Sequence, residues 1–372
     1  MNAEKRKAKR KKKRRIRWMR LLVFVVITAA GSWYFFSGGK IPDVPFLKSF
    51  EPVRLYAIDT VGNSAETAIM DKGLAVYDAG VLTFYDLDGA SVWEKTFEAE
   101  NPRVFADENH IVFADAEKGK LWRMDYGGET VNSLEKEFPL GGVYQNRASY
   151  LLYFGQEGNQ LDVIDNKGKT ITEITVPKGY ILDAAISDNS SIVAVSTLSI
   201  ENEKYYSSIL FYNLDGTVVA GNRYDGEIIF RTFFTGMDEL KALANDGVFS
   251  MSRDGDVEWE KKIEGNLSRA DINDSGYIAM VFEKEDGKRA YLGLDENGVF
   301  TDETEIEEDA SIVSLSERHG AVFTKKAVRI FDLKGRLEGV IESDFEIEGG
   351  GWLGDDRIML VYENRMEIMD IY

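Results

Sequence analysis

A strand that ends in Asp or Asn, with Gly three residues later, recurs about every 40 residues along this chain of 372 residues. Clear copies are Leu82–Gly89, Leu161–Gly168, Leu210–Gly216 and Val328–Gly335. Each copy is a short run of apolar residues that stops at a tight turn, where glycine supplies the positive φ that the turn needs. A repeat of this length with strand periodicity identifies an architecture of repeated sheets, not a reaction.

The same turn can be placed seven times after residue 53, and no long helical pattern interrupts the series. A second polar turn, between the first two strands of a copy, is visible in Ala184–Val195 and Ala270–Val281. Each copy therefore reads as a unit of four short strands. The glycines of the seven turns are Gly89, Gly128, Gly168, Gly216, Gly255, Gly298 and Gly335.

An eighth copy is split between the two ends of this region. It starts near Phe345 and stops at Tyr372, where its outermost strand should begin, while Val53–Asp59 is a strand pattern without a partner. If this segment supplies the missing strand, the sheets close into a ring without a long open edge. We therefore predict an all-β fold, a β-propeller of eight four-stranded blades. Seven blades remain an alternative, because the turn at Gly128 is weak and the fourth copy has an insertion around Ile200–Tyr206.

The net charge of −19 combines two parts of opposite sign. Residues 1–20 carry +11 and the rest carries −30. Residues 18–37 are apolar apart from Arg20, and 20 residues at about 1.5 Å each cross a hydrocarbon core of about 30 Å. The positive-inside rule then predicts a basic cytoplasmic tail over 1–17, a transmembrane helix over 18–37 and an extracytoplasmic location for the remainder of the chain.

Residues 38–52 form a linker that holds three of the six prolines, and such a linker is semi-rigid. It would keep the propeller, residues 53–372, close to the cell membrane. A cleaved signal peptide with a site at Thr28–Ala30 is the alternative, but the apolar stretch continues through aromatic residues past that site, which favours an anchor. The basic tail can also bind anionic lipid.

Composition excludes several classes of function. The chain has no cysteine, so it has no disulfide, thiolate metal site or cysteine nucleophile. His110 and His319 are its only histidines, which argues against a metal site built from several histidines. The acidic main part would be repelled by nucleic acid, and neither a G-x-S-x-G motif nor a P-loop is present. The sequence thus predicts no catalytic, cofactor-binding or metal-binding residue.

The strand–Asp–x–x–Gly–x–x–x–Trp pattern resembles the blades of quinoprotein-like and YVTN-type propellers, which are similar to WD40 repeats. Trp93 and Trp259 complete the pattern in two copies. Quinoprotein dehydrogenases imply a quinone and a calcium ion, but this chain lacks the vicinal cysteines common in such sites, so we expect no cofactor. We interpret the two tryptophans as locks between neighbouring blades. The whole layout is similar to uncharacterised single-pass propeller proteins of Gram-positive bacteria, a resemblance that implies no catalytic residues.

Three local patterns imitate ligand sites. Gly349–Gly354 fits G-x-G-x-x-G, but a strand and not a helix follows it, so we predict a flexible blade turn. Asp271–Gly276 begins like a calcium loop, yet Phe282 stands where the bidentate acid belongs. Asp302–Asp309 is the densest acidic stretch and could hold a divalent cation or a basic partner, although a solvated outer loop is the favoured interpretation.

The favoured function is a non-enzymatic one: a monomeric, membrane-tethered binding or scaffold module for an envelope protein or polymer. Propeller loops form a broad face suited to such partners. Two alternatives stay open. One is an enzyme that acts on wall glycan through carboxylates at the propeller centre, and the other is a ligand sensor that signals through a membrane partner.

Overall fold

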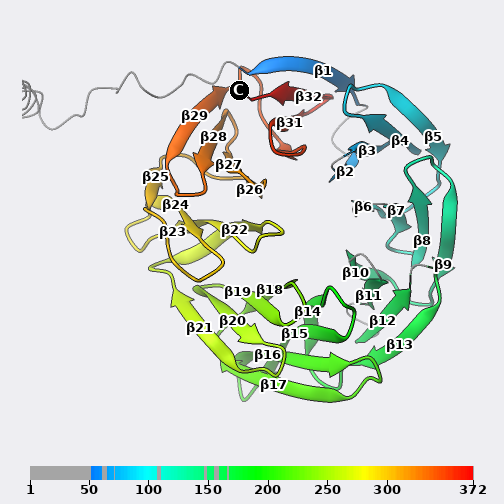
Figure 1. The fold of residues 1–372 in the computed structure, drawn as a ribbon, viewed down its shortest axis with the longest axis vertical. Coiled ribbons are helices and arrows are strands. Elements are labelled where there is room, and N and C mark those ends of the chain that lie inside the picture. Colours follow the sequence, from blue (N-terminus) through cyan, green and yellow to red (C-terminus); the bar gives the residue numbers. More distant parts are fainter. Residues whose placement is uncertain are drawn as a thin grey trace, which may run out of the picture. The chain divides into compact units, whose positions relative to one another are not determined.

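The structure is a computed structural model that describes residues 52–60, 65–70, 72–106, 110–145, 149–154, 159–165 and 167–371. These residues form eight antiparallel sheets of four strands each, which are arranged as blades around a common centre (Figure 1). The prediction of an all-β propeller with eight blades is therefore confirmed, and the alternative of seven blades is wrong.

In each of the first seven blades the chain runs from the innermost strand outward. Blade 1 consists of β2 (Glu66–Met70), β3 (Gly73–Asp78), β4 (Val81–Asp86) and β5 (Ser91–Thr96), and blade 2 of β6 (Pro102–Ala106), β7 (His110–Asp115), β8 (Lys120–Asp125) and β9 (Thr130–Glu135). Blade 3 consists of β10 (Leu140–Gln145), β11 (Ser149–Phe154), β12 (Gln160–Asp165) and β13 (Thr170–Thr175), and blade 4 of β14 (Tyr180–Ile186), β15 (Ile192–Glu201), β16 (Lys204–Asn213) and β17 (Val218–Asp225). Blade 5 consists of β18 (Ile229–Thr235), β19 (Glu239–Ala244), β20 (Gly247–Ser252) and β21 (Val257–Lys262). Blade 6 consists of β22 (Asn266–Ile272), β23 (Ile278–Glu283), β24 (Arg289–Leu294) and β25 (Thr304–Ile306). Blade 7 consists of β26 (Ile312–Leu315), β27 (His319–Phe323), β28 (Ala327–Asp332) and β29 (Leu337–Glu342).

The eighth blade is built from both ends of the propeller. Its inner strands are β30 (Gly349–Trp352), β31 (Arg357–Tyr362) and β32 (Arg365–Asp370), and its outermost strand is β1 (Val53–Asp59), which pairs antiparallel with β32. The predicted closure of the ring by Val53–Asp59 is confirmed. Closure covers the outer edge of β32, which would otherwise be free to pair with other chains.

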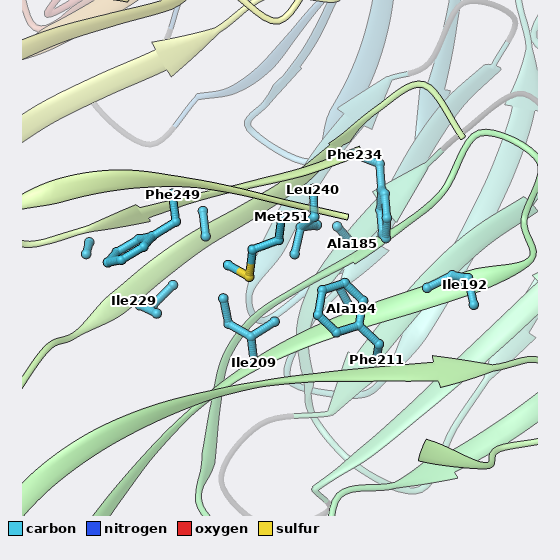
Figure 2. Packing of buried hydrophobic residues seen from close by; sticks show 12 residues of the cluster. Ala185, Ile192, Ala194, Ile209, Phe211, Ile229, Phe234, Leu240, Phe249 and Met251 are labelled. Atoms are coloured by element: carbon cyan, nitrogen blue, oxygen red, sulfur yellow. The ribbon is translucent and has the colours of Figure 1, made fainter. Parts of the chain in front are cut away.

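The hydrophobic core consists of layers between blades. Figure 2 shows one such layer, in which Phe211 of blade 4 and Phe249 and Met251 of blade 5 lie among small and branched side chains. These residues are almost fully buried. The outermost strands instead alternate exposed and partly buried residues, as in β5 and β21. Each blade therefore buries both faces of its middle strands and only one face of its outer strand, which explains the continuous apolar runs in the sequence.

The recurring turn closes the third strand onto the fourth. In blade 1 the Asp86 carboxylate accepts hydrogen bonds from the amides of Asp88 (3.0 Å) and Ala90 (2.9 Å), and the Gly89 amide donates to the Asp86 carbonyl. Gly89 has φ of +81°, a conformation that costs little only for glycine. The aspartate thus caps the turn that the glycine makes possible, and this local chemistry is what repeats along the chain.

The two tryptophans lock neighbouring blades, as predicted. The Trp93 indole nitrogen donates to the Tyr126 carbonyl (3.0 Å), and its ring covers Gly128 of blade 2. Trp259 covers Gly298 of blade 6 in the same manner. The aromatic ring therefore occupies the space that a side chain on the glycine would need.

Replacing Gly128 with Ala should destabilise the propeller by about 2–4 kcal/mol, because φ is +81° there and the new Cβ would stand 2.8 Å from Trp93 Cγ. Gly226 is the matched control, since its φ is +77° and no atom lies within 4 Å of the position that a Cβ would take. Gly226→Ala should cost about 1 kcal/mol through φ alone. Chemical denaturation of the two variants measures the difference, and equal losses would contradict the role of Trp93.

The prediction of a flexible turn at Gly349–Gly354 is wrong, because residues 349–352 form β30, the innermost strand of blade 8. A Cβ on Gly350 would lie 2.2 Å from Phe323, so the glycine reflects close packing against blade 7. The insertion around Ile200–Tyr206 lengthens β15 and β16 to 10 residues each and adds no separate element.

The predicted tail, transmembrane helix and most of the linker, residues 1–51, lie outside the described residues. Among the residues that the structure does describe, no helix is long and apolar enough to cross a membrane.

Candidate functional site

The two rims of the propeller differ in the turns that they carry. The first strand residue of the propeller, Val53, pairs with Asp370, and Asp370 pairs on its other side with Arg357, which directly follows the turn between β30 and β31. Val53 therefore lies on the same rim as the turns that join the first and second strands of the blades. We call the rim with these first-to-second-strand turns the proximal rim, and the rim with the second-to-third-strand turns the distal rim. Hydrogen bonds join the proximal turns from blade to blade: Asp188 N to Gly236 O (3.3 Å), Asp274 N to Glu317 Oε1 (3.0 Å) and Glu317 N to Asp355 Oδ1 (3.1 Å).

On the distal rim, the hairpin of β15 and β16 in blade 4 is longer than its counterparts. Its register is continuous from Ile192 paired with Asn213 to Glu201 paired with Lys204. Asn202 and Glu203 form the two-residue tip with φ of 51° and 63°. Positive φ at both positions is the geometry of a tight hairpin turn whose twist matches that of the strands. The hairpin therefore extends the sheet and does not end in a loose loop.

One face of the hairpin is braced by charged groups. The Arg223 guanidinium lies 3.6 Å from the centre of the Tyr206 ring and forms ion pairs with Glu201 (3.0 Å) and Asp225 (2.7 Å). Lys178, in the connection from the preceding blade, approaches Glu201 to 3.8 Å. A planar guanidinium that both stacks and pairs holds the strands in one arrangement. The hairpin is thus fixed from one side.

The other face of the hairpin is apolar and exposed. Ile200 pairs directly with Tyr205, and Tyr180 of β14 pairs with Leu198, so these four side chains share one face of the sheet. Ile200 is 72%, Tyr180 61% and Tyr205 44% exposed. We call Tyr180, Ile200 and Tyr205 the hairpin patch. Large apolar side chains that are gathered on a rigid element, with a charged network behind them, have the composition of a protein-binding surface.

Three carboxylates stand on innermost strands, where the enzyme alternative from the sequence placed catalytic acids: Glu66, Asp183 and Asp271. Glu66 forms an ion pair with Arg103 of blade 2 (3.2 Å). Asp183 Oδ2 accepts hydrogen bonds from the Thr232 amide (2.6 Å) and hydroxyl (3.2 Å) of blade 5, and Asp271 Oδ2 accepts one from the Leu315 amide (2.8 Å) of blade 7. Burial raises the pKa of both aspartate carboxyls above the ordinary value. Each aspartate therefore satisfies the amide edge of the next blade, and the two act as links between blades.

The other candidates from the sequence take structural positions. His110 and His319 begin the second strands of blades 2 and 7; His110 Nδ1 lies 2.8 Å from Arg123, and His319 Nε2 lies 3.3 Å from Glu338. In Asp271–Gly276 the turn follows β22, and the Asn273 side chain accepts a hydrogen bond from the Tyr277 amide (2.9 Å).

The acidic stretch Asp302–Asp309 lies at the outside of blade 6, as predicted for an outer loop, but it includes the short strand β25. Its acids pair with bases of neighbouring strands: Lys284 with Glu303, Lys288 with Glu305 (3.3 Å) and Arg289 with Asp309 (2.5 Å). Over the part of the chain that the structure describes, no three His, Asp or Glu side chains are grouped to hold a metal ion. Several acids of this stretch are thus engaged in ion pairs at the outer edge of blade 6.

The propeller region also identifies the family of this chain. Residues 48–371 match the model of a family that is described as a family of unknown function, DUF5711. The chain belongs to this family. The match covers the whole propeller, so the family is defined by the ring described above. No curated protein matches the sequence.

Solved structures similar to this DUF5711 propeller share its fold at low sequence identity. BamB from Moraxella catarrhalis is 11% identical with a TM-score of 0.59, and the match covers 86% of this chain and 99% of that one. The C-terminal WD40 domain of Sif2 is 13% identical with a TM-score of 0.66, over 87% and 99% of the two chains. Sqt1 from Chaetomium thermophilum, solved with the N-terminus of ribosomal protein L10 bound, is 13% identical with a TM-score of 0.61, over 86% and 100%. These likenesses establish the propeller fold alone.

The hairpin patch was not predicted from the sequence. The insertion around Ile200–Tyr206 was visible, but its exposure was not, because strand residues of this kind are usually buried. The available signal was the pairing of Ile200 with Tyr205 across a two-residue Asn–Glu turn. Because this strand pair extends beyond the strand pairs of the neighbouring blades, no described part of a neighbouring blade covers the apolar face of its extension.

Proposed function

We propose that this protein is a membrane-tethered, extracytoplasmic propeller that binds a protein of the cell envelope through the hairpin patch. The observation that carries the proposal is the exposure of Tyr180, Ile200 and Tyr205 on one face of a hairpin whose other face is braced by Arg223. Tyrosine is among the few residue types that supply most of the binding energy at the centre of an interface. Because the hairpin is already ordered, little conformational entropy is lost on binding.

The course of the chain supports a tether of this kind. The propeller begins at Val53 on the proximal rim, and the hairpin tip at Asn202–Glu203 lies on the distal rim. An anchor over residues 18–37 would be attached through the proximal rim, which leaves the hairpin patch on the rim away from the attachment. The +11 charge of residues 1–20 orients such an anchor with its tail in the cytoplasm.

The carboxylates at the centre favour binding over catalysis. Asp183 and Asp271 each accept hydrogen bonds from a neighbouring blade, so neither is a free general base in this arrangement. A protein partner is favoured over a polymer, since the patch combines two tyrosines with a large aliphatic side chain on an extended hairpin, and aromatic residues are enriched in protein interfaces.

The test is capture of the partner from intact cells by crosslinking, with the full chain and with the variant Tyr180→Ser/Ile200→Ser/Tyr205→Ser. We expect a reproducible envelope protein with the parent chain and at least a tenfold lower yield with the variant, because truncation of three central contacts removes most of the binding energy. The matched control is Val92→Ser/Val131→Ser/Val257→Ser, which alters three exposed apolar residues on outermost strands.

The control should retain the partner. Equal loss from both variants, or undiminished capture by the hairpin variant, would contradict the assignment of the patch. Protease added to intact cells checks the topology separately: residues 53–372 should be digested, and their survival until the cells are permeabilised would refute an extracytoplasmic location.

A further inference from the structure

A pocket of about 480 Å³ lies among the innermost strands of blades 2 to 5, away from the hairpin patch. On β10 it is lined by Gly141 and Gly142, whose lack of side chains leaves the space open. The volume lies in the range of small-molecule sites. The polar residues of its wall are Asn101, Arg103, Tyr144, Asp183, Arg231 and Thr232.

Arg231 is the charged group in this wall that makes no direct hydrogen bond or ion pair with a described residue. It follows a bulge at Phe230, where the register between β18 and β19 shifts from Ile229 to Arg231. Such a bulge redirects the next side chain, and Arg231 is exposed although it stands on an innermost strand. Among the described residues Arg231 makes no hydrogen bond and no ion pair within 4.0 Å, and its charge acts on Asp183 and Asp271 from a greater distance. Its guanidinium therefore offers a full set of donors to the pocket.

The other charges of the pocket are already engaged. Arg103 forms an ion pair with Glu66 (3.2 Å), and Asp183 accepts two hydrogen bonds from Thr232. Burial raises the pKa of Asp183, and the positive charge of Arg231 is among the smaller effects that oppose this rise. Arg231 is thus the one cation of the wall whose donors are unused, and its charge acts on the carboxyls of Asp183 and Asp271 without a direct ion pair. Because Asp183 lies in the same wall, a ligand with two negative charges is disfavoured.

Tyr144 adds a neutral donor at the same wall. Burial raises the pKa of its hydroxyl to about 12, so the hydroxyl keeps its proton at neutral pH. The Phe105 side chain lines the pocket from β6 and provides apolar contact. A cation, a neutral donor and an apolar wall around one small space suit a ligand with a single carboxylate on a partly apolar body.

We propose that this pocket binds a small organic monocarboxylate, about the size of a dipeptide, with its carboxylate on Arg231. A bidentate contact between guanidinium and carboxylate fixes the orientation of such a ligand. The Tyr144 hydroxyl donates to the same group or to a neighbouring carbonyl, and the ligand body lies along Gly141–Gly142. This site is independent of the hairpin patch, since the two share no residue.

Binding is measured by saturation-transfer NMR and calorimetry on the purified full-length chain. The probes are N-acetylglycine, N-acetylphenylalanine, the dipeptide Ala-Ala, the neutral N-acetylphenylalanine amide and inorganic phosphate. We expect at least one carboxylate to bind and the amide to bind at least tenfold more weakly than its acid. Arg231→Gln should weaken the carboxylate at least tenfold, whereas Arg253→Gln, which alters an arginine paired with Asp238 outside the pocket, should leave it unchanged.

Both variants should remain folded, and Arg231→Gln should melt only slightly below the parent, because Arg231 makes no direct ion pair and only its charge acts on Asp183 and Asp271. Failure of all three carboxylates to bind would overturn the proposal, and so would binding that survives Arg231→Gln. Preference for phosphate over every carboxylate would overturn the ligand class. Loss of partner capture by the hairpin variant has no bearing on these outcomes, so the two proposals fail separately.

Discussion

Deletion of Val53–Asp59 from the full chain should cost more than about 5 kcal/mol and leave a protein that self-associates. Such a loss equals the whole stability of many domains. Tyr56 and Ile58 pack with Met366 and Ile368 in the layer between blades 8 and 1. Without β1, β32 becomes an open edge with unpaired amides and carbonyls, which is a template for pairing with another chain.

The deletion also removes links to blade 1 and an ion pair within blade 8. The Tyr56 ring covers Gly89, its hydroxyl donates to the Asp86 carbonyl (3.3 Å), and Arg54 pairs with the buried Glu367 (3.2 Å). Arg357, which donates to the Leu87 carbonyl (2.7 Å), would remain as a contact across the closure. The ring would then be held at this point by far fewer interactions, so cooperative unfolding should begin there.

Thermal unfolding with light scattering on the purified full-length chain tests this expectation. The control deletes seven residues ahead of the propeller, 41–47, and should melt like the parent. A pair of point variants sharpens the result: Ile58→Asp places a charge at a buried position, whereas Leu55→Asp alters the exposed residue at the bulge of the same strand. We expect a loss of about 3 kcal/mol or more from the first and below about 1 kcal/mol from the second. An unchanged melting temperature after deletion of Val53–Asp59 would refute the role of the split blade.

The fold was predictable from the sequence because its determinants are local and repeated. The carboxylate of Asp86 and the positive φ of Gly89 define the turn within four residues, and closely related turns return in each of the first seven blades. Closure of the ring was predictable for a related reason. One end of the propeller region carries a strand pattern without a partner, and the other end lacks an outermost strand. Pairing the two is the one arrangement that leaves no exposed sheet edge at either end.

The features that the sequence did not indicate depend on contacts between blades. The glycines of β30 were predicted as a turn because glycine is most frequent in turns, whereas Gly350 is in fact required by Phe323 of the neighbouring blade. The free guanidinium of Arg231 depends on the bulge at Phe230, which no local pattern marks. Exposure of Ile200 depends on the length of its hairpin relative to those of adjacent blades. The fold and the turn chemistry could therefore be predicted from the sequence, but the candidate sites could not.

Replacement of the buried Lys241 with alanine should cost about 3 kcal/mol. The side chain is fully buried on β19 of blade 5, and its ammonium donates to the carbonyls of Glu296 (2.8 Å) and Gly276 (3.4 Å) in blade 6. Burial lowers the pKa of this lysine, and the nearby Glu239 (3.7 Å) partly opposes the shift. Alanine would leave a cavity and two carbonyls without their donor, and both effects are destabilising.

Methionine at the same position separates packing from polar contacts. Lys241→Met keeps most of the side-chain volume and removes the charge that must be desolvated, so it should cost less than half of the loss caused by alanine. Lys204→Ala, at the exposed base of the hairpin tip, is the control and should be neutral within about 0.5 kcal/mol. Urea unfolding of the three variants measures these differences. Equal losses from alanine and methionine would mean that the hydrogen bonds to blade 6, and not the filled volume, hold the two blades together.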